Sequence, residues 1–162
     1  ANGYNRELMY VRPGGAGVKV SDTNNVQNDE NQVALAFDGK KPRIVSRLKR
    51  GSIGGQSDYD MVFYASDDGK AWSAPLALPK MGSTAPRQAI VAQNGSVTIF
   101  AGGPRLLRSS DLANFTIVDL GLAQEAKSPS AVLDARGKGW FGFEGTSPKA
   151  SAVGGVVLYR EP

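Results

Sequence analysis

Short apolar segments separated by turn dipeptides recur along this chain. Three of them begin units with a common plan, in which an apolar segment, a tight turn and a second apolar segment follow one another. These first segments are Gln32–Phe37, Gln88–Ala92 and Ser130–Leu133. Asp38-Gly39 and Asn94-Gly95 follow the first two, and such dipeptides favour the positive φ angles that hairpin turns need. The pattern therefore predicts three β-hairpins.

Further apolar segments extend each expected hairpin to three or four strands. The expected second strands are Arg43–Leu48, Ser96–Ala101 and Gly139–Glu144. The expected third strands are Asp60–Ala65, Arg105–Arg108 and Val156–Arg160. The first two units continue into expected fourth strands at 74–78 and 116–120, whereas no segment keeps apolar residues at helical spacing through three turns. Four antiparallel strands in about 45 residues are typical of a β-propeller blade, so the pattern predicts an all-β chain of about three blades.

The two ends of the chain complement each other in this plan. Glu7–Arg12 and Gly17–Ser21 resemble a third and a fourth strand, and the last unit stops after its third strand. We expect one domain over 1–162, with a partial blade at 1–29, blades at 30–82 and 83–124, and a partial blade at 125–162. Propellers close with about 4 to 8 blades, so closure requires oligomerisation or a missing part of the chain. A homodimer that forms one ring by twofold symmetry is the preferred arrangement.

Composition narrows the chemistry. The 162 residues include no Cys and no His, which excludes a disulfide framework, thiol catalysis and the commonest general base and metal ligand. We expect no cofactor and no metal site. Lys and Arg number 19 against 15 for Asp and Glu. This balance favours a partner such as an acidic sugar over nucleic acid, because the basic residues form no dense stripe.

The sequence also indicates where the protein is located. No apolar run approaches the roughly 18 residues of a membrane-spanning helix, so we expect no membrane span. The sequence starts at Ala1 without an initiator Met, as it would after removal of a signal peptide or if it began within a longer chain. The expected location is therefore secreted or periplasmic.

Two turns carry a family resemblance. The segment Ala65-Ser66-Asp67-Asp68-Gly69-Lys70-Ala71-Trp72 resembles the Asp box (BNR repeat) of sialidase-like β-propellers, with Asp67, Gly69 and Trp72 at its Asp, Gly and Trp positions and Ala65 in place of Ser. The next unit has Asp111 and Phe115 in a similar turn, which more weakly resembles the Ser-x-Asp-Leu-x-x-Trp turn of five-bladed glycosidase propellers. Asp boxes lie at the propeller periphery, so the resemblance implies structural roles for these residues.

The sialidase resemblance also implies residue types for catalysis. In sialidases three Arg bind the substrate carboxylate, a Tyr activated by Glu is the nucleophile, and an Asp is the acid/base. Tyr10-Val11-Arg12-Pro13 departs from the family's first Arg segment, so that role is not carried over. Glu144 and Tyr159 are the candidate Glu and Tyr pair, and Glu144-Gly145 also resembles the general-acid segment of the five-bladed glycosidases. Further acidic candidates are Asp29, Glu30 and Asp134.

Candidate binding residues emerge when the units are aligned on their turns. Where the first strands begin, this alignment makes Asn31, Arg87 and Pro129 equivalent at one position and Gln32, Gln88 and Ser130 equivalent at the next. Amide and guanidinium groups of this kind hydrogen-bond sugar hydroxyls and carboxylates, and Trp140 offers an aromatic face for stacking. We also expect residues 51–58, with Gly54-Gly55, to form a loop that overhangs the site.

Three functions fit these features. Non-catalytic carbohydrate binding by a sialidase-like propeller is favoured, because the family's Arg segment is not matched. The first alternative is a glycoside hydrolase, either a sialidase-like or related exo-glycosidase or a segment of one, so enzyme activity is not decided by the sequence. The second alternative is a protein-interaction propeller, which fold alone never excludes. Carbohydrate is the expected partner in the first two cases.

Overall fold

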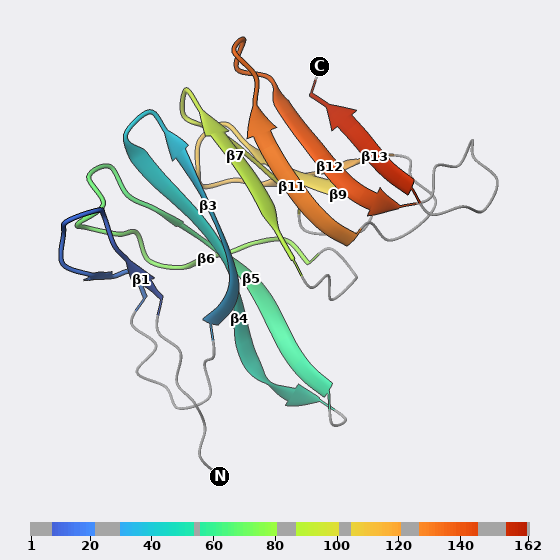
Figure 1. Ribbon diagram of the computed structural model, residues 1–162. Coiled ribbons are helices and arrows are strands. Elements are labelled where there is room, and N and C mark those ends of the chain that lie inside the picture. Colours follow the sequence, from blue (N-terminus) through green and yellow to red (C-terminus); the bar gives the residue numbers. More distant parts are fainter. Residues whose placement is uncertain are drawn as a thin grey trace.

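The computed structural model describes residues 8–21, 30–53, 56–80, 87–100, 105–120, 127–145 and 155–161. Within these ranges the chain forms strands and turns without a helix, and it therefore contains no apolar helix of membrane-spanning length (Figure 1). The strands are β1 (Met9–Tyr10), β2 (Val18–Lys19), β3 (Glu30–Asp38), β4 (Lys41–Ile53), β5 (Gln56–Ala65), β6 (Leu76–Ala77), β7 (Ala89–Gln93), β8 (Ser96–Phe100), β9 (Arg105–Ser109), β10 (Thr116–Asp119), β11 (Lys127–Leu133), β12 (Gly139–Gly145) and β13 (Gly155–Arg160).

The strands form four antiparallel sheets, and each sheet consists of consecutive strands. Sheet A is β1–β2, sheet B is β3–β4–β5–β6, sheet C is β7–β8–β9–β10, and sheet D is β11–β12–β13. The prediction of an all-β chain with four-stranded antiparallel sheets of the propeller-blade kind is confirmed. Within the described residues these sheets do not close into a ring.

Tight turns join the first two strands of sheets B, C and D. Gly39, Gly95 and Gly137 have φ angles of 61°, 77° and 75°, a conformation that glycine adopts without steric cost. Neighbouring hairpins also touch, because the Gly95 amide donates to Asp38 Oδ2 at 2.9 Å. The turn residues therefore shape each hairpin and also link sheet B to sheet C.

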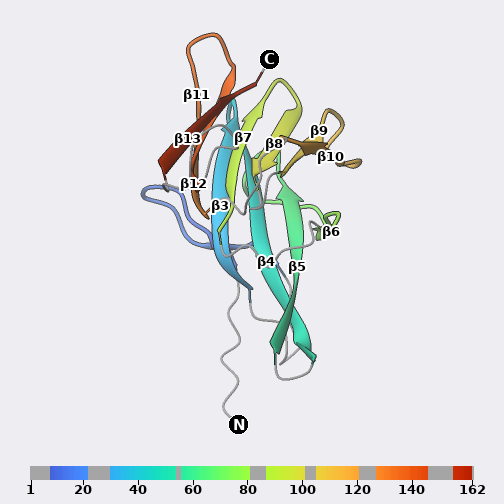
Figure 2. The same cartoon turned by 90° about the vertical axis from the view of Figure 1, so that its right-hand side faces the viewer.

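The sheets stack face to face in chain order. Figures 1 and 2 show the first strands β3, β7 and β11 side by side, with the later strands of each sheet spreading away from them. Side chains alternate between the two faces of a strand, as strand geometry requires. Ile44 packs toward sheet A and Val45 toward sheet C, and both are buried. Sheets B and C therefore bury apolar side chains on both faces.

Three apolar clusters fill the three junctions between sheets. Between A and B, the rings of Tyr10 and Trp72 meet edge to face with centroids 5.4 Å apart. Between B and C, Phe63 meets Phe115 in the same way at 5.2 Å. Between C and D, Phe100 stacks on Phe143 at 4.9 Å. Buried aliphatic side chains complete these clusters, among them Val62, Val45, Ile90, Ile99, Leu107, Val91 and Leu106.

The prediction of a loop over residues 51–58 is wrong for its described part. β4 and β5 continue as a two-stranded ribbon, with Gly51 opposite Asp58 and Ile53 opposite Gln56. A register shift after Lys49 accompanies this extension, while residues 54–55 lie outside the described ranges. Strand pairing provides partners for the backbone amides and carbonyls, so this glycine-containing segment extends the sheet.

Candidate functional site

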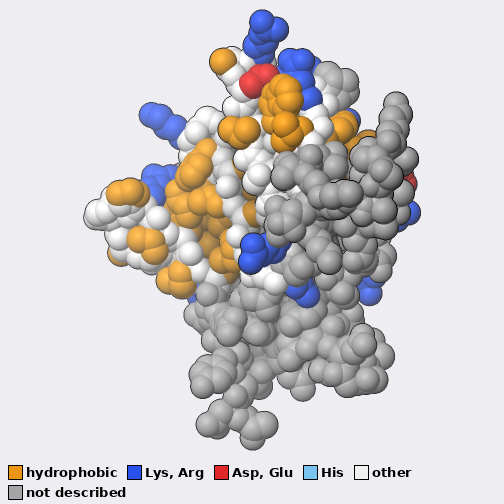
Figure 3. Space-filling model, turned by 45° about the vertical axis from the view of Figure 1, so that its right-hand side comes forward, with side chains coloured by type: hydrophobic (Ala, Val, Ile, Leu, Met, Phe, Trp, Pro, Cys, Tyr) orange, Lys and Arg blue, Asp and Glu red, His pale blue; other side chains and the backbone are white. Residues whose placement is uncertain are grey.

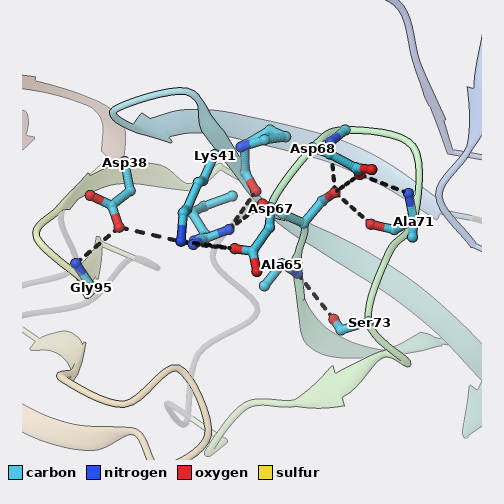
Figure 4. A network of polar contacts seen from close by, with 12 residues as sticks. Asp38, Lys41, Ala65, Asp67, Asp68, Ala71, Ser73 and Gly95 are labelled. Carbon is cyan, nitrogen blue, oxygen red and sulfur yellow. Dashed lines mark hydrogen bonds and ion pairs between the residues drawn. The ribbon is translucent and has the colours of Figure 1, made fainter.

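Two side chains, Ser66 and Asp68, hold the turn that follows β5, and Figure 4 labels Asp68 within its network of polar contacts. The Gly69 amide donates to Ser66 Oγ at 2.8 Å. The amides of Lys70 and Ala71 donate to Asp68 Oδ1 at 2.7 and 3.1 Å. Short polar side chains that accept from nearby amides stabilise tight turns. Glycine completes the turn with a φ of 71°.

The turn that follows β9 repeats this arrangement. Ser109 Oγ accepts from the Leu112 amide at 2.9 Å, and Asp111 Oδ1 accepts from the amides of Ala113 and Asn114 at 3.0 and 2.8 Å. Leu112 has a φ of 62°, the left-handed conformation that glycine has in the first turn. Each group lies 43 residues after its counterpart (109 − 66 = 43). Two turns of different sequence therefore share one hydrogen-bond pattern.

The structure corrects the predicted alignment of the first turn by one residue. Asp68 is the counterpart of Asp111, because both carboxylates accept the amides two and three residues later. Asp67 instead has a side chain that is 79% exposed, with Oδ1 3.3 Å from Lys41 Nζ and 3.6 Å from Arg43 Nη2. The Ser position of the turn is correspondingly Ser66, the residue after Ala65.

The aromatic positions of the two turns have equivalent packing. Trp72 of sheet B packs on Tyr10 of sheet A, and Phe115 of sheet C packs on Phe63 of sheet B. In both cases the ring contacts the preceding sheet. Arg12 also contacts the first turn, because its Nη2 donates to the Asp68 carbonyl at 2.5 Å. The turns therefore join neighbouring sheets as well as neighbouring strands.

Turn amides lower the pKa of both turn carboxylates. For Asp68 the largest cause is the hydrogen bond from the Lys70 amide, and the amide of the next residue adds to it. For Asp111 the amide and side chain of Asn114 are the largest causes, and they hold its pKa far below the usual range. Both groups are ionised at neutral pH, so they act as hydrogen-bond acceptors.

A cleft opens at the turn edge between sheets C and D, and we call it the C–D cleft. Its volume is about 500 Å³, which lies within the range of pockets for small ligands. Its lining is rich in hydroxyl, amide and charged groups, including those of Ser96, Thr98, Arg108, Ser110, Asp111, Asn114, Lys138 and Glu161. Ser96, Ser110 and Asn114 are exposed at its mouth. These groups are therefore available to a ligand.

A polar network holds the wall of the C–D cleft. Thr98 Oγ1 donates to Glu161 Oε1 at 2.6 Å, and the Gly139 amide donates to Glu161 Oε2 at 3.1 Å. Arg108 Nε lies 3.3 Å from the same Oε1 as an ion pair without hydrogen-bond geometry. Arg108 Nη2 donates to the Tyr159 hydroxyl at 3.1 Å. The network fixes one guanidinium and one carboxylate at the cleft.

A related cleft of about 440 Å³ lies at the turn edge of sheet B and reaches Leu112 of sheet C. Arg43 lines it but is only 2% exposed. Its Nη1 donates to the carbonyls of Pro42 and Ser66, and its Nη2 lies 3.9 Å from Asp38 Oδ2. This guanidinium is occupied within the fold. The C–D cleft, with its exposed polar groups, is therefore the better candidate for ligand binding.

The backbone of sheet D places Tyr159 and Glu144 at separate positions of the β12–β13 ladder. Tyr159 lies opposite Phe141 in the β12–β13 ladder, and its hydroxyl accepts from Arg108. Glu144 lies opposite Val156, three residues further along β12, and its side chain lies outside the described part. At about 3.3 Å per strand residue, the two backbone positions are roughly 10 Å apart. Tyr159 instead belongs to the wall of the C–D cleft.

The polar candidates at the start of the first strands lie apart from the C–D cleft. Gln32, whose φ is 53°, accepts a hydrogen bond from Arg47 Nη1 through Oε1. Gln88 is 8% exposed, and its side-chain amide has no hydrogen-bond partner among the described residues. Arg87 is exposed, whereas the side chain of Asn31, like that of Glu30, lies outside the description. Asp29 lies outside the described residues altogether.

Asp134 and Trp140 stabilise the hairpin between β11 and β12. The amides of Arg136 and Lys138 donate to Asp134 Oδ1, and the Trp140 indole donates to Oδ2 at 3.1 Å. The Lys138 amide is the largest cause that lowers the Asp134 pKa, and the indole is the next. The guanidinium of Arg160 lies over the Trp140 ring, 5.4 Å from its centroid. Both predicted candidates therefore have structural contacts here.

Sequence reasoning does not single out the residues of the cleft wall. Thr98 lies in β8, Arg108 lies in β9, and Glu161 directly follows β13. No local sequence motif connects these three residues. The two turns, in contrast, carry a sequence signal that identifies their hydrogen-bonding residues. Ser66 and Asp68 recur as Ser109 and Asp111 at one spacing, and this recurrence identifies the correct alignment.

Comparison with known proteins adds a similarity to a solved structure. No protein-family profile matches the chain, and no curated protein sequence matches it. Among solved structures, the chain is similar to a mutant of NanB sialidase from Streptococcus pneumoniae, with a TM-score of 0.49 and 10% sequence identity. The similarity covers 89% of this chain and 25% of that one, so this chain spans about a quarter of the sialidase's length. The description of the sheets as propeller-like blades rests on their own topology and stacking.

Proposed function

We propose that this protein binds carbohydrate without catalysis and that the C–D cleft is the binding site. The observation that carries the proposal is the combination of size and lining. A cleft of about 500 Å³ presents hydroxyl, amide, carboxylate and cationic side chains together. Sugar hydroxyls both donate and accept, so a surface that mixes donors with acceptors complements them.

The charges of the cleft favour a neutral sugar. Arg108 and Lys138 supply two cations, and Asp111 and Glu161 supply two anions. Arg108 and Glu161 already neutralise each other as an ion pair with Nε and Oε1 3.3 Å apart. A strongly anionic ligand would have to displace a carboxylate from its cationic partner. The C–D cleft therefore suits a neutral sugar better than the acidic sugar that the net charge suggests.

The hydrogen bonds that lower the pKa of Asp111 suit this carboxylate to the role of hydrogen-bond acceptor rather than that of general acid. Glycoside hydrolysis requires one carboxyl group to carry a proton that it delivers to the leaving oxygen. Such a group has a raised pKa, whereas hydrogen bonds lower the pKa of Asp111. Tyr159 is the other candidate for catalysis. Its hydroxyl accepts a hydrogen bond from Arg108, and among the described residues no carboxylate is hydrogen-bonded to that hydroxyl. An ionised Asp111 and a Tyr159 hydroxyl held by Arg108 suit a rigid surface that hydrogen-bonds sugar hydroxyls.

A blocking substitution tests the proposal. A glycan array first identifies a neutral sugar that binds, and calorimetry measures its affinity for the wild type. Ser110→Trp fills the mouth of the cleft with an indole, and we expect at least about tenfold weaker binding. Ala113→Trp is the matched control, because Ala113 is exposed on the same turn and does not line the cleft. This control should bind as the wild type does.

Three results would contradict the proposal. The array could yield no ligand, Ser110→Trp could bind unchanged, or both tryptophan variants could lose affinity equally. Recovery of the sugar intact after prolonged incubation is expected for non-catalytic binding. Release of a reducing end that depends on the protein would instead favour the glycoside hydrolase alternative.

A further inference from the structure

The stack of sheets ends on one side in an uncovered apolar strand face. Val33, Leu35 and Phe37 of β3 are 47%, 46% and 46% exposed, and we call them the β3 flank. Leu35 lies opposite Ile44, which is buried against sheet A, so the flank continues a face that sheet A already covers in part. Figure 3 shows hydrophobic side chains gathered on the side of the molecule where β1, β2 and β3 lie.

The other end of the stack carries a second uncovered apolar face. Val132 of β11 and Leu158 of β13 are 63% and 68% exposed, and Trp140 of β12 lies opposite Val132 in the ladder. We call these three residues the D face. Their strand neighbours, such as Phe141 and Tyr159, pack on sheet C from the opposite side of the sheet. Among the described residues, a neighbouring sheet therefore covers one face of sheet D. On the other face, the guanidinium of Arg160 lies over the Trp140 ring beside the exposed Val132 and Leu158.

The internal junctions show what each end face would pack against. Leu35 and Phe37 lie three and one residues before the last paired residue of β3, as Ile90 and Ala92 do in β7. Ile90 and Ala92 are buried against sheet B, at 6% and 2% exposed. By this equivalence, the β3 flank is the kind of surface through which a sheet packs on the sheet that precedes it in the chain.

The D face has the complementary position. Val91 of β7 lies on the face of sheet C that meets sheet D and is 5% exposed. Val132 occupies the same place in β11, between two residues that face the preceding sheet. The D face is therefore the kind of surface on which the next sheet in the chain would pack. One chain carries one surface of each kind.

We propose that the β3 flank of one copy packs on the D face of a second copy of this chain, and that two such contacts close a twofold dimer. The contact extends the existing junction between sheets A and B across β3. It also buries both apolar end faces of each copy, because the β3 flank of each copy packs on the D face of the other. Closed assemblies of this kind leave no apolar end exposed.

The first test is the molar mass in solution. Light scattering after size exclusion should give twice the 17.1 kDa chain mass over a wide range of protein concentration. Leu35→Lys and Leu158→Glu each place a charge in both contacts of the dimer, so each variant should raise the dissociation constant by about a hundredfold or more. A wild type that stays at 17.1 kDa at every concentration would overturn the proposal.

Mixing the two variants tests the pairing of the faces. A mixed dimer keeps one wild-type contact and places Lys on the flank opposite Glu on the D face, so the mixture should recover dimers that neither variant forms alone. Ile117→Lys is the matched control, because Ile117 is 44% exposed on β10, away from both end faces, and it should remain dimeric. Circular dichroism checks that each variant keeps its β structure.

Two other outcomes would overturn this pairing. If Leu158→Glu dimerises normally while Leu35→Lys does not, the dimer is formed by two flanks. If the mixture stays monomeric while both variants remain folded, the two faces do not meet.

Discussion

Ser66 and Asp68 accept amides that a tight turn would otherwise leave without partners, and Ser109 and Asp111 do the same one unit later. The second turn places Leu112 at positive φ, where a side chain is strained. That side chain packs against the core between sheets B and C, so burial offsets part of the strain. The two turns therefore reach one geometry from different residues.

Acidification tests the role of Asp68. Hydrogen bonds lower its pKa in the folded state, so its contribution to stability is present above the unfolded-state pKa of about 4 and is lost as the pH falls through the folded-state value. Asp68→Asn removes the titrating group. The urea midpoint of this variant should therefore fall less than that of the wild type between neutral and strongly acid pH.

Asp67→Asn is the matched control for this experiment. Asp67 is the adjacent acidic residue, and its ion pairs with Lys41 and Arg43 are made by a side chain that is 79% exposed. Exposed ion pairs contribute little to stability, so the urea midpoint of this variant should stay close to that of the wild type at neutral pH. If Asp67→Asn flattens the dependence of the urea midpoint on pH and Asp68→Asn does not, the assignment of Asp68 to the turn is wrong.

The strands of sheets B, C and D largely follow the predicted segments. The expected Arg43–Leu48 lies within β4, and the expected Asp60–Ala65 lies within β5. Apolar runs and hairpin glycines are local properties, so the sequence reveals them. β6 spans only Leu76–Ala77 of the expected 74–78, where Pro75 and Pro79 lack the amide that a ladder needs.

The cleft was less predictable than the strands, for a physical reason. Arg108 and Glu161 meet through the stacking of two sheets, and Tyr159 joins them from β13. Such contacts depend on the spacing between sheets, which no local pattern specifies. The shift from Asp67 to Asp68 has a different cause. A neighbouring carboxylate offered the same chemistry one residue away, and only the hydrogen bonds distinguish the two.

The docking of sheet A on the first turn can be tested at Gly69. A Cβ there would lie 2.7 Å from Cε1 of Tyr10 and 2.8 Å from Nη2 of Arg12, and the φ of 71° adds strain. Gly69→Ala should therefore lower the free energy of unfolding by about 1–2 kcal/mol from the backbone and by a further 1–3 kcal/mol, roughly, from the clash. Urea denaturation measures the total.

Gly39→Ala provides the comparison. Gly39 has a φ of 61° but nothing within 4 Å of an added Cβ, so this variant should show the backbone cost alone. Hydrogen exchange at the Val20 amide, which donates to the Leu8 carbonyl, should accelerate in Gly69→Ala and stay unchanged in Gly39→Ala. Equal destabilisation of the two variants would show that sheet A does not rest on this turn.

At the scale of the whole molecule, one repeated junction explains both the cleft and the end faces. Each sheet buries an apolar face on its neighbour, and the polar turns lie together along one edge of the stack. Where the turn of sheet C meets the hairpin of sheet D, the polar edge opens into the C–D cleft. Where the stack ends, the apolar faces lack a neighbour among the described residues.

The central claim is that the C–D cleft binds a sugar, and the most direct test is an NMR titration of the labelled protein with a neutral sugar selected on the array. We expect saturable shifts of the amides of Ser96, Ser110, Asn114 and Lys138, which come from both walls of the cleft. Saturable shifts confined to Arg87, Gln88 and their neighbours at the start of β7 would place the site elsewhere and contradict the claim.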